Sequence, residues 1–199
     1  MNRLVSIVGA SGVGKTAFVQ ALAKTGKFLT AYEQHAERPF QALFKHDPRY
    51  ALANQVDYLL LRAEQERDLR YAAGPQIGLM DGGLDLDFHG FTRLFHQRGL
   101  LTGPEYDLCR RLYSFIRQAQ PLPDLLVHLC AEEGMVAARL ASRDRINIAT
   151  ADDTALFNAY VEEWLASIPS TQILKLNVSH ETLEYGQSVC IVLKTLNIS

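Results

Sequence analysis

One eight-residue motif near the N-terminus limits the folds open to this chain. The residues from Gly9 to Thr16 read G-A-S-G-V-G-K-T and match the pattern G-x-x-x-x-G-K-[ST]. Glycines at this spacing let the backbone bend so that several N–H groups point inward at a phosphate. The lysine reaches the β- and γ-phosphates, and the last hydroxyl is a ligand for Mg²⁺. The motif therefore predicts a P-loop that binds ATP or another nucleoside triphosphate together with Mg²⁺.

The flanking segments support this interpretation. The apolar run 4–8 is typical of a buried strand, and residues 15–24 have the apolar spacing of a short helix. The positive end of that helix would face the phosphates. A glycine turn with an incidental lysine is the alternative. The candidate nucleotide-binding residues are Gly9, Ala10, Ser11, Gly12, Val13, Gly14, Lys15 and Thr16, with Lys15 also catalytic and Thr16 also a metal ligand.

Strand and helix patterns alternate along the whole chain, which predicts a parallel sheet covered on both faces. We expect a single P-loop α/β domain over residues 1–199, a three-layer α/β/α sandwich with a five-stranded, mainly parallel sheet. The expected strands are 4–8, 28–32, 77–80, 125–130 and 173–178. The expected helices are 15–24, 50–70, 84–98, 104–119, 133–142, 152–166 and 180–197, the last with strand as an alternative.

Charge and hydropathy indicate which partners and which compartment to expect for the protein. The net charge of −2 gives no basic excess for nucleic acid. No apolar run approaches the length of a membrane span, and the N-terminus does not resemble a signal peptide. The cysteines Cys109, Cys130 and Cys190 have no metal-binding or disulfide spacing. Reduced thiols in a cytoplasmic protein are therefore expected.

A P-loop needs a second acid near the metal, usually at the end of a neighbouring apolar strand. Asp81, which follows the run 77–80, is the candidate, and a simple turn acid in Asp81-Gly82 is the alternative. The chain has no N-K-x-D guanine motif, so a GTPase is not favoured.

The order and spacing of further motifs over about residues 3–166 resemble the deoxynucleoside kinases, within the thymidylate kinase-like group. The matching segments, in chain order, are the P-loop, Glu33, 38–44, 47–52, Gln55 to Arg62, Asp81 at a D-R-S position, 99–106, 125–131, the arginines Arg139, Arg143 and Arg145, and Tyr160 to Trp164. The resemblance implies an ATP-dependent kinase that transfers the γ-phosphoryl group to a (deoxy)nucleoside or a related small acceptor.

The resemblance also implies roles for residues on the acceptor side. Glu33 would accept the proton of a sugar 5′-hydroxyl, and Gln55 would hydrogen-bond the edge of the base. Arg62 and Asp81 would also contact the substrate, and Asp81 would in addition hold the metal. The alternatives are a surface glutamate at 33, an ordinary polar helix residue at 55 and a structural ion pair at 62.

The three late arginines resemble the arginine-rich lid of the family, at about 139–150. Arg139 and Arg143 are four residues apart and so share a helix face, with Arg145 just beyond them. Guanidinium groups pair well with phosphate oxygens and spread the charge of the transition state. Arg143 would be catalytic, and the other two would bind nucleotide. A solvated basic helix end is the alternative.

The sequence departs from the family pattern around the sugar. Gly82 replaces the arginine of D-R-S, and Lys45 replaces a tyrosine that contacts the 3′-hydroxyl. Lys45 is a candidate for binding an anionic acceptor. Two alternatives to a nucleoside kinase stay open: a catalytically weak P-loop regulator, and a kinase for a nucleoside monophosphate or another small metabolite. Relatives often form dimers through helices equivalent to 50–70 and 84–98, so a homodimer is implied.

Overall fold

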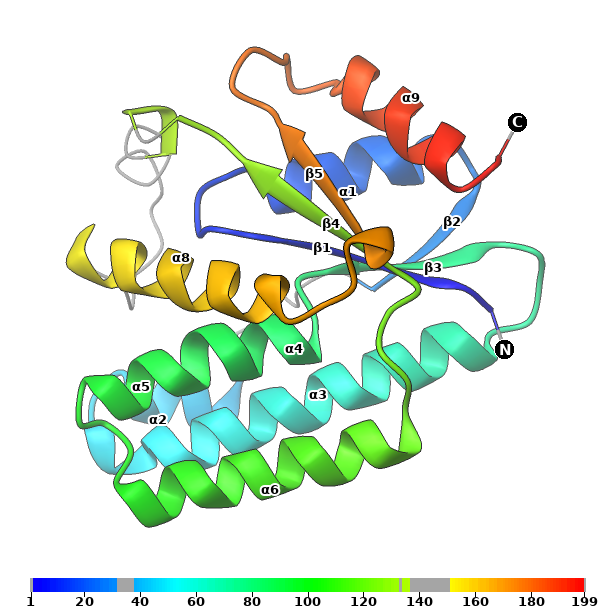
Figure 1. Cartoon of the computed structure of the whole chain (residues 1–199). Helices are drawn as coiled ribbons and strands as arrows, with labels where there is room; N and C mark the ends of the chain where they lie inside the picture. The colour runs from blue at the N-terminus through cyan, green and yellow to red at the C-terminus, as the bar shows by residue number, and fades with distance from the viewer. Residues whose placement is uncertain (1, 32–37, 133, 137–150, 199) are drawn as a thin grey trace.

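The computed structural model describes residues 2–31, 38–132, 134–136 and 151–198. Its centre is a five-stranded sheet in the order β2-β3-β1-β4-β5, and every neighbouring pair of strands is parallel (Figure 1). The strands are β1 (Leu4–Gly9), β2 (Phe28–Ala31), β3 (Ile77–Asp81), β4 (Leu125–Cys130) and β5 (Ile173–Asn177). The expected five-stranded parallel sheet is thus confirmed.

Helices cover both faces of this sheet, as Figure 1 shows. One face carries α1 (Lys15–Ala23) and α9 (Gly186–Thr195). On the other face lie α3 (Ala51–Tyr71), α8 (Ala151–Ala166) and the run α4 (Leu84–Leu86), η2 (Asp87–Thr92) and α5 (Arg93–Gln97), with α6 (Gly103–Ala119) outside them. Short elements complete the description: α2 (Pro39–Phe44), η1 (Pro48–Tyr50) and η3 (Ser170–Gln172).

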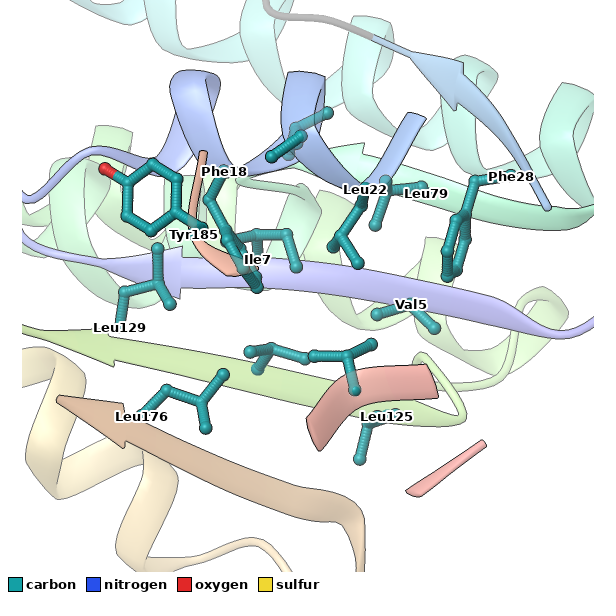
Figure 2. Packing of buried hydrophobic residues seen from close by; sticks show 14 of the residues in the cluster. Val5, Ile7, Phe18, Leu22, Phe28, Leu79, Leu125, Leu129, Leu176 and Tyr185 are labelled. Carbon is teal, nitrogen blue, oxygen red and sulfur yellow. The ribbon is translucent and has the colours of Figure 1, made fainter. Parts of the chain in front are cut away.

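The strand alternation explains the two apolar layers. In β1, Val5 and Ile7 face α1 and α9, whereas Leu4 and Val8 face the opposite side. Figure 2 shows the first layer, in which Phe18 of α1 meets Tyr185 edge-on at a ring distance of 5.3 Å. The central strands β1 and β3 are fully buried, which fixes their register, and all neighbouring strands run parallel. Their carboxyl ends therefore meet at one edge of the sheet.

The helices differ from expectation in two places. The predicted helix 84–98 contains a π-helical stretch, η2, between α4 and α5. Helix α9 occupies only 186–195 of the predicted 180–197, and the strand alternative is wrong. The predicted helix 133–142 lies largely outside the described residues. In the described parts of the chain, no helix combines the length and hydropathy needed to cross a bilayer.

Candidate functional site

The P-loop connects β1 to α1 at the carboxyl edge of the sheet. Gly9 ends β1 with φ of +139°, and a Cβ there would lie 2.5 Å from the carbonyl oxygen of Leu129 in β4. Only glycine allows this close approach of two backbones. The loop then folds back, with the Val13 N–H donating to the Ala10 carbonyl at 3.3 Å. The amides at the start of α1 follow directly, as phosphate binding requires.

Lys15 contacts the loop backbone, and Thr16 contacts the acid at the end of β3. The Lys15 ammonium donates to the carbonyl oxygens of Gly9 and Ala10, both at 2.9 Å, and so lies over the loop. The Thr16 hydroxyl donates to Asp81 Oδ2 at 2.5 Å. Asp81 is only 1% exposed. The structure thus places the P-loop hydroxyl against the strand-end acid.

The second oxygen of Asp81 supports a cation at this position. Among the described residues, Asp81 Oδ1 is buried and has no hydrogen-bond partner. A buried carboxylate oxygen without a partner is costly. Carboxylate and hydroxyl oxygens are the ligands that Mg²⁺ prefers, usually with phosphate oxygens completing the set. Asp81 and Thr16 therefore fit the metal that the motif predicts.

The turn after β3 explains why residue 82 is glycine. Gly82 has φ of +84°, a region that favours glycine. Its N–H donates to the Ile7 carbonyl at 3.0 Å, and its own carbonyl accepts from the Ser6 hydroxyl. A Cβ at this position would lie 3.7 Å from the Arg62 Nη2 atom. The guanidinium of Arg62 thus lies beside the position where the family pattern has an arginine.

Arg62 forms a buried ion pair with Asp87. Its Nε donates to Asp87 Oδ2 at 2.8 Å, and the side chains are 3% and 9% exposed. Arg62 comes from α3, whereas Asp87 begins the π-helical stretch that follows β3. Burying two charges costs several kcal/mol per ion before pairing. A buried ion pair therefore adds little net stability to the fold. Its guanidinium is a hydrogen-bond donor and its carboxylate an acceptor, and the two lie side by side.

Gln55 joins this group through Thr92. The Thr92 hydroxyl is 3.0 Å from Gln55 Oε1 and 3.1 Å from the Asp87 carbonyl. Gln55 and Thr92 are 3% and 0% exposed. The chain of contacts Gln55–Thr92–Asp87–Arg62 therefore forms a continuous polar strip in an otherwise apolar layer between α3 and η2.

A second buried network holds the turn that carries Gly82. Arg117 of α6 donates to both oxygens of Glu66 at 2.7 and 2.9 Å, and to Asp85 Oδ2 at 2.7 Å. Glu66 also accepts from the Leu84 N–H at 3.2 Å. Burial raises the pKa of Glu66, and the Arg117 guanidinium opposes this shift. The network holds Leu84 and Asp85, directly after the turn, against α3 and α6.

His89 of η2 packs between α6 and α8. Its ring stacks on Trp164 of α8 at 5.3 Å and meets Tyr113 edge-on at 5.3 Å. Its Nε2 atom is 3.2 Å from the Tyr113 hydroxyl. Burial lowers the pKa of His89 to about 4. The imidazole is therefore neutral near pH 7 and acts as an aromatic packing group.

The structure brings together part of the predicted site. Lys15, Thr16 and Asp81 meet at the P-loop, and Gln55 and Arg62 meet on the polar strip. Lys45 is exposed at the end of α2. Glu33 and the arginines Arg139, Arg143 and Arg145 lie outside the described residues, so their roles stay predictions.

Two residues of the strip, Asp87 and Thr92, were missed from the sequence. A signal for Asp87 exists, because it is a carboxylate in the largely apolar run Leu84-Asp85-Leu86-Asp87-Phe88, six residues after Asp81. Thr92 gives no such signal. Its role depends on the π-helical turn, which places its hydroxyl over the Asp87 carbonyl five residues earlier.

Comparisons of sequence place the chain among known kinases. Residues 5–192 match the sequence model of one family, deoxynucleoside kinase. The chain is 24% identical over 183 residues to a deoxyadenosine/deoxycytidine kinase of Bacillus subtilis, covering 89% of this chain and 83% of that protein. It is 26% identical over 162 residues to a deoxyadenosine kinase of Dictyostelium discoideum, covering 79% of this chain and 65% of that protein.

Comparisons of structure agree on the fold. A deoxyadenosine kinase from M. mycoides with bound dCTP superposes with a TM-score of 0.77 at 14% identity, covering 98% of both chains. The same enzyme with bound dATP gives a TM-score of 0.77 at 16% identity, covering 98% of this chain and 99% of that one. At this level of identity the match establishes the P-loop α/β fold.

Proposed function

The chain belongs to the deoxynucleoside kinase family, and from this premise we propose that it transfers the γ-phosphoryl group of ATP to the 5′-hydroxyl of deoxyadenosine or deoxycytidine. The observation that carries the proposal is the buried Arg62–Asp87 pair beside the turn that follows the metal acid Asp81. In the proposal, this pair would line the acceptor site, next to the phosphate-binding loop.

On the donor side, the backbone amides of residues 9–16 would hold the phosphates. Lys15 would exchange its two carbonyl partners for phosphate oxygens, and Thr16 with Asp81 would hold Mg²⁺. The cation, when bound, neutralises charge on the phosphate oxygens. The binding motif does not by itself distinguish ATP from another triphosphate, so ATP is part of the proposal.

On the acceptor side, Arg62 and Asp87 would read the base. A carboxylate accepts from an exocyclic amino group, and a guanidinium donates to a ring nitrogen. Adenine and cytosine each present an amino donor beside a ring-nitrogen acceptor, whereas thymine presents a carbonyl in place of the amino group. Gln55 Oε1 accepts from Thr92, which leaves its NH₂ group to donate to the base. This arrangement favours amino-bearing bases over thymine.

Four residues complete the proposal from the sequence. Glu33 would take the proton of the 5′-hydroxyl, and Arg143, with Arg139 and Arg145, would close over the transferred phosphoryl group as a lid at about 139–150. All four lie outside the described residues. Their assignment rests on the ordered motifs of the family.

The two departures from the family pattern have different consequences. At position 82 the nearby Arg62 guanidinium keeps a positive group beside the turn. At position 45 the exposed lysine offers a cation in place of a hydroxyl contact to the sugar. We therefore propose separately that Lys45 binds an anionic acceptor. Lys45→Ala should then bind the acceptor more weakly, and an unchanged affinity would contradict this role.

We also propose a cytoplasmic homodimer. Most large apolar side chains of the segment 84–98, which the sequence offered as an interface helix, are buried in the protomer: Leu84, Leu86, Phe88, Leu94 and Phe95. Exposed apolar side chains instead lie on α3 and α6, which pack together: Leu60, Tyr71, Leu108 and Phe115. Light scattering of the wild type and of Leu108→Glu/Phe115→Glu tests whether this surface joins two copies.

The enzymatic proposal is tested with a panel of acceptors and γ-labelled ATP. Deoxyadenosine and deoxycytidine should yield labelled monophosphate, thymidine should yield far less, and Glu33→Gln should abolish transfer. Glu184→Gln, an exposed glutamate of the described region, is the matched control. Transfer to a nucleoside monophosphate alone would favour the second kinase class. ATP binding without transfer to any acceptor would favour a P-loop regulator.

A further inference from the structure

A group of three potential metal ligands lies on the sheet face that α8 covers. His128 and Cys130 are two residues apart in β4, so their side chains lie on the same side of the strand. Glu162 of α8 lies opposite them. One ligand atom from each side chain falls within 4.8 Å of the others. Neither the phosphate site nor the polar strip uses any of these residues.

The distances between these atoms are close to those around a bound metal. Cys130 Sγ is 3.7 Å from His128 Nε2, and that nitrogen is 3.9 Å from Glu162 Oε1. Zinc binds sulfur at about 2.3 Å and nitrogen or oxygen at about 2.0–2.2 Å, with tetrahedral geometry. Ligand atoms around such an ion are therefore roughly 3.3–3.7 Å apart, so small side-chain movements suffice.

We propose that His128, Cys130 and Glu162 form a binding site for a divalent transition-metal ion of the zinc class. The donor set of thiolate sulfur, imidazole nitrogen and carboxylate oxygen suits this class and disfavours Mg²⁺, which selects oxygen ligands. The site is therefore distinct in chemistry from the magnesium site at Thr16 and Asp81. Three protein ligands leave a fourth position for water.

Metal binding at this site must displace one cation and one proton. The Lys175 ammonium, from the strand next to β4, is 3.2 Å from Glu162 Oε1. When the metal binds, the Cys130 thiol gives its proton to water, its sulfur coordinates as thiolate, and the ammonium leaves the carboxylate. Lys175 is thus a competitor of the metal for Glu162.

Access and placement also fit a bound ion. His128 is buried, whereas the Glu162 side chain is 54% exposed, so an ion enters from the solvent side of α8. The opposite edge of α8 is already tied to the α5 region by the ion pairs Arg93–Glu163 and Arg98–Asp153. A metal at Glu162 would tie the same helix to β4. The consequence is a rise in thermal stability when metal is added.

The experiment uses Co²⁺ and Zn²⁺ with the full chain under reducing conditions. Co²⁺ should produce a thiolate-to-metal absorption band with one equivalent bound, and Zn²⁺ should displace it. Cys130→Ser should remove the band, and His128→Gln and Glu162→Gln should weaken binding by about tenfold or more. Cys190→Ser and Glu163→Gln are the matched controls, since they change an exposed cysteine and the neighbouring glutamate.

Lys175→Ala separates this site from incidental binding. Because the ammonium competes for Glu162, its removal should tighten Co²⁺ binding and enlarge the rise in melting temperature. Melting of each variant without metal shows that it is folded. The proposal is overturned if no thiolate band appears, if Cys130→Ser retains the band, or if Lys175→Ala binds the metal no more tightly than the wild type.

Discussion

The proposed donor and acceptor halves of the site are built by different means. The donor half is a contiguous loop made mainly of backbone, in which Gly9 passes against β4 and the amides lead into α1. The acceptor half consists of side chains from separate segments, with Gln55 and Arg62 on α3 and Asp87 and Thr92 on η2. Backbone geometry requires fixed residues, whereas a side-chain pocket can be assembled in several ways.

This difference explains where the family pattern is kept and where it changes. Every residue that the P-loop motif requires is present. At the acceptor side, the arginine expected at 82 is a glycine, and another guanidinium lies beside that position. The comparison predicts that donor-side substitutions are severe and that acceptor-side substitutions alter selectivity and stability.

The largest effect should come from Asp81→Asn. Removing one carboxylate charge from the proposed cation site should lower kcat/KM by about 100-fold or more and raise the Mg²⁺ concentration needed for half-maximal rate. Mg²⁺ titration of initial rates measures both. Asp68→Asn, on the exposed face of α3, is the control. An unchanged Mg²⁺ requirement in Asp81→Asn would contradict the metal assignment.

The helix η2, which carries Asp87 and Thr92, should be sensitive to acid because it also carries His89. Its pKa is 6.5 in the unfolded chain and about 4 in the fold, so the unfolded state binds the proton more tightly. Stability is fully present above pH 6.5 and falls as the pH drops toward 4, by at most about 3 kcal/mol.

Thermal unfolding of His89→Gln between pH 7 and pH 4 tests this expectation. The variant should lose less stability over this range than the wild type does, even though it has lost the stacking on Trp164. The same substitution at exposed His180 controls for the removal of an imidazole. Equal pH dependence in His89→Gln and the wild type would show that His89 is not the source.

A smaller effect is expected at Gly82. A side chain there must adopt φ of +84°, which costs about 1–2 kcal/mol for a residue with a Cβ. Gly82→Ala and Gly82→Arg should therefore both be less stable in urea unfolding, and the arginine should not raise activity. Gly186→Ala, at a glycine without positive φ, is the control. A more active Gly82→Arg would show that the guanidinium of Arg62 does not serve this position.

The contrast between a contiguous loop and side chains from separate segments also explains how much of the protein could be predicted from its sequence. Buried apolar strands and the contiguous P-loop are local patterns, so the sheet was predicted from the sequence, and the structure places Asp81 against Thr16. The roles of both residues in metal binding stay predictions. The Arg62–Asp87 pair joins residues 25 positions apart, and the Thr92 contact depends on a π-helical turn. Neither contact leaves a local pattern in the sequence from which it could be predicted. The group at Cys130 was missed because its third ligand comes from a different element.

The central claim is that Arg62 and Asp87 read the acceptor base while the P-loop independently holds the donor. Steady-state kinetics of Asp87→Asn, with deoxyadenosine and ATP varied in turn, test it most directly. We predict that the KM for deoxyadenosine rises about tenfold or more, as expected for a lost charged hydrogen bond, while the KM for ATP stays within about twofold. An unchanged KM for deoxyadenosine, or an equal rise in both values, would contradict the account.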